Sequence, residues 1–594
     1  MGNSMNIKTK EISKAVRENI NRNKFTYYSN AVFLQLALTV VGGFLLRFMF
    51  QLILISAGQE NLTKDNFLDI FTEPLSFLLI IIFILLVSGL VFFEFSALTL
   101  MVYFSYKKIS FSWKRNFANV FQRLKTLNPV QLLLFMLYFI LMIPLSNLGL
   151  NSVFSEKLDI PDFITEELVK SVSGTVILVV FAAACAYANL RLIFSIPLTV
   201  INGNKFSYNM KKSLELTRKG KIKLVYLFGK FAVVLIFIGL VFLGLSAFVF
   251  DIIDESGSIP MYNSVFYTIS RIILFFFLML AKLAMISILV KIIIDHRELT
   301  EDDGQYNNIK VKKRKLSAVL ISIALIIALG HSGYQMFSES INKDVTVVAH
   351  RGYVSAGVEN SIEALEGAAK AGADYVELDI LLTKDNKFVV MHDYNLKRLA
   401  GIDKKVQDMN FNEVVGLEIK QGNFTSHIPS FEEFVARAKE LNMKLLVELK
   451  PHGKEPENYA ELFIDEIRRL GVDKEYKTMS LDLDLMEEIE DKAPEIETGY
   501  VIPLQFGSFA EDSIDFFVIE DFSFNDILSI QAKKDGKDIF VWTINDPDKI
   551  TKYLHKPVSA IITDYPEMVE DEIKNEEEDN SYFEKLYRLL DIKF

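Results

Sequence analysis

Long apolar runs dominate the N-terminal half of the chain. Seven stretches come near or exceed the roughly 20 apolar residues that an α-helix needs to cross a bilayer. They lie at about 31–57, 75–104, 131–150, 175–201, 224–250, 265–294 and 316–334. The third and seventh are the shortest and the sixth contains Arg271, Lys282 and Lys291, so six or eight spans are the alternatives to seven. The pattern predicts a polytopic helical membrane domain over residues 31–334.

Charge alternates between the segments that connect these stretches. Lys and Arg gather in the N-terminal segment 1–30, after the second and fourth stretches, and just before the seventh, whereas the other connections carry mainly Asp and Glu. Cytoplasmic segments near membrane spans collect Lys and Arg. The alternation therefore predicts a multi-pass cell-membrane protein with a cytoplasmic N-terminus and an extracellular location for everything beyond about residue 335. The first stretch is too long and too far from the start for a cleavable signal peptide, so we expect it to be retained.

A different pattern begins at Val345, where short β-branched runs alternate with amphipathic helical stretches. Eight runs read as strands, namely VTVVA, YVELDI, KLLVELK, YKTMSL, TGYVI, FFVIE, DIFVWTI and AIITD. This alternation predicts an α/β TIM barrel, a closed parallel barrel with outer helices, over residues 345–570. An open doubly wound sheet is the alternative. The barrel is favoured because polar residues stand within or at the ends of several strands, as a site on the C-terminal rim requires.

The remaining segments are a linker at 335–344 and a C-terminal tail at 571–594. The tail contains an acidic run, followed by a stretch with apolar residues at helical spacing. We expect this amphipathic helix to pack on the barrel rather than lie against the membrane.

Composition narrows the classes of function. The chain has 594 residues, of which 51% are hydrophobic, and a lipid bilayer is therefore an expected partner. The single cysteine, Cys185, excludes an intramolecular disulfide and a cysteine-rich zinc cluster. A formal net charge of −11 argues against a nucleic-acid partner.

Two predicted strands carry pairs of charged residues at alternate positions. Glu377 and Asp379 are two apart in YVELDI, and Glu448 and Lys450 are two apart in KLLVELK. Alternate residues of a strand share a face, and buried charges need a cation or each other. An exposed charged strand face is the simpler alternative for either pair alone. Three carboxylates without cysteine indicate an oxygen-ligand site suited to calcium or magnesium.

Two of the seven histidines directly follow apolar strand-like runs. His350 follows VTVVA and His392 follows FVVM, which places both where a rim site would collect them. Two histidines beside a metal can act as general base and general acid near neutral pH. Arg351 and Lys450 could neutralise phosphate oxygens. The pattern indicates phosphodiester cleavage.

Several separated motifs resemble the signature of the glycerophosphodiester phosphodiesterase family. The matching residues, in order, are His350, Arg351, Gly352, Glu359, Asn360, Glu377, Leu378, Asp379, His392, Asp393, Leu396 and Arg398, then the VELK, FVWTIND and TDYP segments that end at Lys450, Asp546 and Pro566. The N-terminal part is similar in architecture to the multi-span domain of membrane-anchored members from Gram-positive bacteria. The segment after Arg351 departs from the glycine- and proline-containing loop of many members.

The resemblance implies roles for individual residues. It implies His350 and His392 as the catalytic acid/base pair and Glu377, Asp379 and Glu448 as ligands of a divalent metal, most simply calcium, with magnesium as the alternative. It implies that Arg351 and Lys450 bind phosphate, that Glu359 is a further polar site residue, and that Trp542 lines the substrate pocket or packs in the barrel.

The resulting hypothesis is an outward-facing membrane enzyme. It would hydrolyse glycerophosphodiesters, derived from lipids or from glycerol-phosphate polymers of the envelope, to glycerol 3-phosphate and an alcohol. One alternative is a lysophospholipase D-like lipid phosphodiesterase. Another is a transporter or sensor in which the barrel is a binding module, a role that charges within the spans, such as Glu94 and Lys282, would support.

Overall fold

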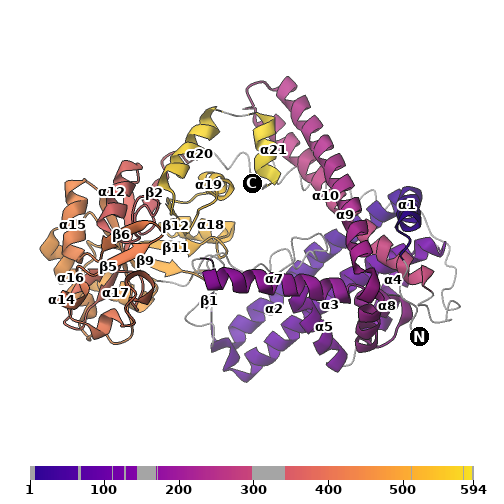
Figure 1. Ribbon diagram of the computed structural model, residues 1–594, viewed down its shortest axis with the longest axis horizontal. Helices are drawn as coiled ribbons and strands as arrows, with labels where there is room; N and C mark the ends of the chain where they lie inside the picture. The colour runs from indigo at the N-terminus through magenta and orange to yellow at the C-terminus, as the bar shows by residue number, and fades with distance from the viewer. Residues whose placement is uncertain are drawn as a thin grey trace. The chain divides into compact units, whose positions relative to one another are not determined.

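The computed structural model describes residues 7–59, 61–63, 69–109, 111–125, 129–142, 169, 172–257, 259–296, 342–509, 512–578 and 581–590. The chain divides into two compact units. One comprises residues 1–57, 70–338 and 581–594, and the other comprises residues 58–69 and 339–580. Figure 1 shows the first as a set of long helices and the second as a sheet surrounded by shorter helices.

Long apolar helices make up the first unit. Within the described residues its elements are α1 (Thr9–Ala37), the π-helical η1 (Leu38–Gly42), α2 (Gly43–Ser56), α3 (Pro74–Tyr106), α4 (Trp113–Lys125), α5 (Pro129–Met142), α7 (Val172–Leu192), α8 (Ser195–Asn202), α9 (Phe206–Ile253), α10 (Pro260–Asp295) and α21 (Tyr582–Leu590), with the 3₁₀ turn η2 (Asp69–Phe71) at its boundary.

Five of these helical segments are long and apolar enough to cross a membrane, at Thr9–Ser56, Pro74–Tyr106, Ser173–Asn202, Phe206–Ile253 and Met261–Asp295. They lie over five of the seven predicted spans. The third predicted span contains the shorter apolar helix Val130–Leu141 and continues beyond the described residues. The seventh, at 316–334, and most of the predicted linker lie outside the described residues, so the count of seven stays a prediction.

Eight parallel strands close into a barrel in the second unit, which confirms the predicted TIM barrel over the open sheet. The strands are β2 (Thr346–Ala349), β3 (Tyr375–Leu382), β7 (Lys444–Leu449), β8 (Lys477–Ser480), β9 (Glu497–Ile502), β11 (Phe516–Glu520), β12 (Asp538–Trp542) and β13 (Ala560–Thr563). Each pairs in parallel with the next, and β13 pairs with β2, which in turn pairs with β3. All eight predicted strands are present.

Successive side chains along each barrel strand point alternately into the barrel and toward the outer helices. Val348, Met479, Phe516 and Phe540 belong to the cluster inside the barrel. Their neighbours in sequence pack against the helices outside, which are α12 (Ile362–Lys370), α15 (Phe431–Glu440), α16 (Tyr459–Leu470), α17 (Leu483–Lys492), α18 (Asp526–Lys534), α19 (Pro547–Leu554) and α20 (Pro566–Glu578). Inward positions near the carboxyl ends of the strands are therefore the ones that can form a site.

An insertion after β3 adds structure beside the barrel mouth. It contains β4 (Phe388–Val390), which pairs antiparallel with β3, and then α13 (Lys397–Ala400), the 3₁₀ turn η5 (Val406–Asp408), α14 (Phe411–Val414) and the hairpin of β5 (Glu418–Gln421) and β6 (Phe424–His427). A second addition is an antiparallel pair of short strands, β1 (Asn61–Thr63) and β10 (Gln505–Gly507).

The C-terminal helix differs from the expectation. We expected it to pack on the barrel, but α21 packs on α9 and α10 of the helical unit. Tyr582 is buried against Phe250 and Phe266, and its hydroxyl donates to Asp254 Oδ2 at 2.9 Å. The apolar face of α21 thus covers apolar residues of the α9–α10 hairpin, a surface that sequence periodicity does not distinguish from the barrel. The predicted barrel end at residue 570 falls inside α20.

Candidate active site

The predicted site residues gather at the carboxyl ends of neighbouring strands. His350 directly follows β2, Glu377 and Asp379 lie on β3, and Glu448 lies on β7 with Lys450 just after it. In the parallel register of β3 and β7, Asp379 stands beside Glu448. One carboxylate oxygen from each of Glu377, Asp379 and Glu448 lies within 4.8 Å of the others. Two strands therefore supply one cluster of three acids.

Each β3 acid has one oxygen fixed by the protein and one left over. Glu377 Oε2 accepts a hydrogen bond from the Arg351 backbone N at 2.8 Å, and Asp379 Oδ2 accepts one from Asn360 Nδ2 at 2.8 Å. Glu377 Oε1 and Asp379 Oδ1 are buried and accept no hydrogen bond, although Lys450 Nζ lies 3.3 Å from Asp379 Oδ1. Buried oxygens without donors are costly unless a cation meets them. The cluster therefore fits an oxygen-liganded divalent metal ion.

The pKa shifts of the three acids also favour a bound cation. Burial, followed by the charges of Asp379 and Glu448, raises the pKa of Glu377 well above its ordinary value. Burial is also the main cause that raises the pKa of Glu448, to about 7. For Asp379, burial opposes ionisation, but the charges of Lys450, His392 and Arg351 outweigh it and lower the pKa. Three acids so close together repel one another when ionised, and a divalent cation would relieve that repulsion.

His350 is oriented by a carboxylate on the last barrel strand. Its Nδ1 lies 2.7 Å from Asp564 Oδ1, just past β13. A carboxylate only accepts, so Nδ1 carries the proton and Nε2 of the neutral ring is left without one. Asp564 is held in turn by Asn545, whose Nδ2 donates to Oδ2 at 2.7 Å. Burial opposes ionisation of Asp564, but the His350 ring and the Asn545 amide lower its pKa overall.

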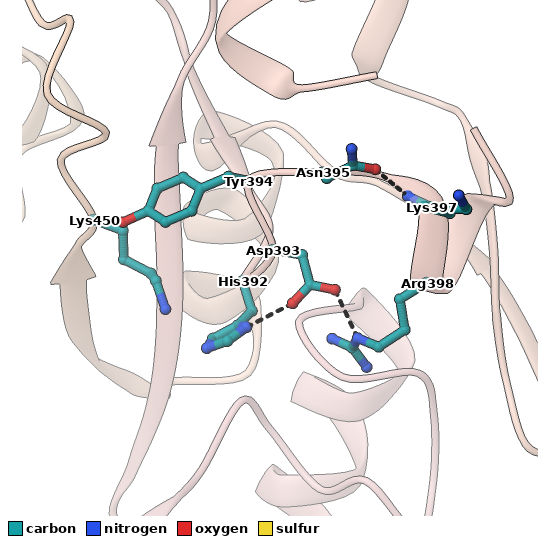
Figure 2. A pocket seen from close by; sticks show the side chains of 7 residues that line it. All are labelled: His392, Asp393, Tyr394, Asn395, Lys397, Arg398 and Lys450. Atoms are coloured by element: carbon teal, nitrogen blue, oxygen red, sulfur yellow. Dashed lines mark hydrogen bonds and ion pairs between the residues drawn. The ribbon is translucent and has the colours of Figure 1, made fainter. Parts of the chain in front are cut away.

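His392, which follows β4, has a matching arrangement (Figure 2). Its Nδ1 lies 2.8 Å from Asp393 Oδ1, and Arg398 Nε donates to Asp393 Oδ2 at 2.6 Å. Burial is the largest cause that lowers the pKa of His392. Both histidines thus present Nε2 and use Nδ1 for orientation.

Glu359 joins two arginines rather than facing an open space. Its side chain, 3% exposed, accepts hydrogen bonds from Arg351 Nη1 at 3.2 Å and from Arg398 Nη1 at 2.9 Å. Gln421 of β5 donates to it at 2.8 Å. Burial opposes its ionisation, yet the hydrogen bonds of Arg398 and the charge of Arg351 hold its pKa at about 2. The ionised Glu359 carboxylate therefore holds both guanidinium groups in position.

The backbone of the loop that carries Arg351 adopts the left-handed conformation at several residues. Arg351 and Asn360 have φ values of 55° and 60°, in the left-handed region. Gly352 has a φ of 81°, and a Cβ there would lie 2.8 Å from the Ala364 backbone carbon. Only glycine fits this close approach. The strained loop brings the Arg351 amide to Glu377 and the Asn360 side chain to Asp379.

A cavity of about 460 Å³ opens beside His392. It is lined by His392, Asp393, Tyr394, Asn395, Lys397, Arg398 and Lys450. Trp542, predicted to line the substrate pocket, does not border this cavity. It lies at the end of β12, against the cluster inside the barrel, and its Nε1 donates to the Val518 carbonyl at 3.1 Å.

Asp564, Asn545 and Gln421 contribute to the site but were assigned no role from the sequence. Asp564 belongs to the quoted TDYP motif and Asn545 to FVWTIND, and each stands just past a strand. A polar residue directly after a strand-like run was the available signal. Gln421 lies in the insertion, and its sequence context carries no comparable signal.

Comparison with known proteins supplies further findings. Residues 13–330 match the family described as the membrane domain of glycerophosphoryl diester phosphodiesterase, and residues 350–568 match the glycerophosphoryl diester phosphodiesterase family. A putative glycerophosphodiester phosphodiesterase of Bacillus subtilis, YhdW, is 27% identical over 247 residues, which are 39% of this chain and 98% of that protein. Human lysophospholipase D GDPD1 is 40% identical over 67 residues, which are 11% of this chain and 21% of that protein.

Solved structures also match. A glycerophosphodiester phosphodiesterase from Parabacteroides distasonis aligns with 27% identity and a TM-score of 0.35, covering 40% of this chain and 99% of that one.

Proposed function

The chain belongs to the membrane-anchored glycerophosphoryl diester phosphodiesterase family and hydrolyses glycerophosphodiesters, and from this premise we propose a metal-assisted acid/base mechanism on an outward-facing barrel. The products are glycerol 3-phosphate and an alcohol. The observation that carries the mechanism is a cluster of three carboxylates, two of them buried and one partly buried, accompanied by two histidines that are each oriented through Nδ1.

Glu377, Asp379 and Glu448 are the proposed ligands of a divalent cation, with calcium favoured over magnesium because it is abundant outside cells. The ion would neutralise charge on the phosphate oxygens. Arg351 and Lys450 border the same carboxylates and add positive charge for phosphate binding.

His350 and His392 are the proposed acid/base pair. One Nε2 accepts the proton of the attacking hydroxyl. If that hydroxyl belongs to water, glycerol 3-phosphate forms directly; if it belongs to the glycerol moiety of the substrate, a cyclic phosphate forms, and water then opens it to glycerol 3-phosphate. The other Nε2 donates a proton to the oxygen of the departing alcohol as its bond to phosphorus breaks. Asp564 and Asp393 keep a proton on Nδ1 of each ring, so that Nε2 is the nitrogen that accepts a proton in the neutral ring and donates one in the protonated ring. Glu359 contributes by positioning Arg351, whereas Trp542 packs against the residues inside the barrel.

Two connections support the proposed outward orientation. Strand β1 lies between the first and second predicted spans and pairs with barrel strand β10. Helix α21, which follows the barrel, bonds through Tyr582 to Asp251 and Asp254 between the fifth and sixth spans. Both loops are among the acidic connections predicted outside, so they share a side with the barrel. This topology needs one more crossing after α10, which the predicted span at 316–334 would supply.

The test is product release by the purified full-length protein. We expect glycerol 3-phosphate from glycerophosphocholine or glycerol-phosphate polymers, and loss of this release on His350→Ala. His427→Ala is the control, because that ring is 47% exposed on the insertion hairpin. Equal loss in both variants, or none in either, would contradict the assignment of His350.

A lysophospholipase D-like activity is the second candidate, favoured by the 40% identity to human lysophospholipase D GDPD1 over 67 residues. Comparing lysophospholipids with soluble diesters separates the two. The transporter or sensor alternative would use charges within the spans. Lys282 and Glu94, however, form a buried pair at 2.9 Å, and Gln35 also donates to Glu94. A satisfied pair favours a structural role, and cleavage without uptake in reconstituted vesicles would support the enzyme.

A further inference from the structure

Half of the large apolar side chains that the barrel unit exposes lie on two neighbouring elements. Among its described residues, six large hydrophobic side chains are more than a third exposed, and three of these are Phe506 at 39%, Ile527 at 64% and Ile530 at 62%. Phe506 lies on β10, and the two isoleucines lie on α18. We call these three residues the apolar patch.

Hydrogen bonds tie the parts of the apolar patch together. The segment after β10 is joined to α18 because Gln531 accepts from the Phe509 backbone N at 2.9 Å and donates to its carbonyl at 3.1 Å. The Phe506 ring meets that of Phe522, in the loop that leads to α18, at 6.1 Å between centroids. The segments that carry the three residues of the patch are thus neighbours.

Other barrel helices expose charge instead. Helix α16 presents Glu461, Asp465 and Arg468 to solvent. On α18, Ile527 and Ile530 are followed at helical spacing by the exposed Lys534, so an apolar stripe ends in a basic residue. Such a stripe suits a lipid surface, where apolar side chains enter the interface and lysine reaches the head groups.

A short stretch of chain connects this region to the first candidate span. Strand β1, the antiparallel partner of β10, begins at Asn61, and α2 ends at Ser56 as the first candidate span. Five residues (56 to 61) reach at most roughly 18 Å when fully extended. β10 starts three residues after β9 ends, at the same end of the barrel as Glu377, Asp379 and Glu448. The chain length therefore limits how far this end of the barrel can lie from the end of the first candidate span.

We propose that Phe506, Ile527 and Ile530 form a membrane-contact surface that seats the barrel mouth on the lipid bilayer. The enzyme then takes amphiphilic phosphodiesters, such as lysophospholipids, from that surface in preference to soluble diesters. The substrate preference rests on the proposed function, whereas the contact with lipid does not.

Site-directed spin labelling tests the contact without reference to activity. The full-length protein with Cys185→Ala and Phe506→Cys would carry a nitroxide and be reconstituted in nanodiscs containing phosphatidylglycerol. Lys474→Cys is the control, because this exposed residue precedes β8 and lies at the opposite end of the barrel. We expect collisions with oxygen, which partitions into lipid, to dominate at position 506 and collisions with a water-soluble nickel complex to dominate at position 474. Equal nickel access at both positions, or protection of position 506 from both reagents, as a second protein copy would cause, overturns the proposal.

Activity tests the preference. Ile527→Ser with Ile530→Ser should reduce hydrolysis of lysophosphatidylcholine in vesicles by about tenfold and leave hydrolysis of glycerophosphocholine within about twofold. Glu461→Ser with Arg468→Ser on α16 is the matched control and should change neither. Equal losses on both substrates, or no loss on either, would contradict the preference, while the labelling result still reports on the contact.

Discussion

Replacement of Asp564 by asparagine should impair proton transfer while leaving the fold intact. In the wild type, Asn545 Nδ2 donates to Asp564 Oδ2, and His350 Nδ1 donates to Oδ1. In Asp564→Asn, the amide oxygen remains the acceptor for Asn545, so the new NH₂ group turns toward His350. Nδ1 must then accept, and the ring proton moves to Nε2. The nitrogen that should exchange a proton with the substrate is left in the wrong state.

The magnitude follows from the interaction that is lost. A hydrogen bond to a charged group contributes ~1.5–3 kcal/mol, so kcat should fall between about 10-fold and 150-fold. KM should change by less than about twofold, because Asp564 orients the histidine rather than the substrate. Release of glycerol 3-phosphate from glycerophosphocholine by the full-length enzyme measures both constants.

A control and a double variant sharpen this test. Asp521 also stands one residue past a barrel strand but pairs with Lys549 and Lys552, so Asp521→Asn should keep kcat within about twofold. Asn545→Ala should add little to Asp564→Asn, since both act through the same ring. A folded Asp564→Asn enzyme with wild-type kcat, or fully additive effects in the double variant, would refute the reasoning.

Four further predictions follow from the same geometry. Glu448→Gln should raise the calcium concentration needed for half-maximal binding by at least about tenfold, measured by isothermal titration on the full-length protein; unchanged binding would remove Glu448 from the ligand set. Arg398→Met should lower kcat by about tenfold because Asp393 and Glu359 lose their shared donor, whereas Arg437→Met, which breaks comparable exposed pairs to Glu366 and Glu440, should not. Gly352→Ala should lower the thermal midpoint of the barrel by more than Gly401→Ala, because both positions have positive φ but only Gly352 meets backbone at 2.8 Å; equal shifts in a melting experiment would count against the crowding argument. In a Cys185→Ala background, Lys474→Cys should react with an impermeant maleimide on intact cells and Lys10→Cys only after lysis; the reverse pattern would invert the proposed orientation.

The alternation of strand-like and helical stretches was enough to predict the barrel, and the two-residue spacing of charged side chains within strands was enough to predict its carboxylates. The eight strands are β-branched runs, and Glu377 and Asp379 share a strand face whatever the tertiary structure. Glu448 joins them because β7 pairs with β3 in a parallel register that places it beside Asp379. The histidines were predictable from their positions directly after strand-like runs.

Long-range contacts were not predictable in the same way. Asp564 reaches His350 only because β13 closes the barrel against β2, across 214 positions of sequence. Gln421 reaches Glu359 from an insertion hairpin whose fold depends on its own small core. The pairing of β1 with β10 and the packing of α21 on α9 and α10 likewise join distant segments. The periodicity of a helix or strand predicts which of its faces is buried but not which segment packs against that face.

The dependence of catalysis on a metal held by Glu377, Asp379 and Glu448 is the central claim, and chelation tests it most directly. The purified full-length protein should release glycerol 3-phosphate from glycerophosphocholine with calcium, lose that activity when a chelator removes the ion, and regain it when calcium is restored in excess. Metal content measured by mass spectrometry on the same samples should rise and fall with the activity. Full activity in metal-free protein would contradict the account.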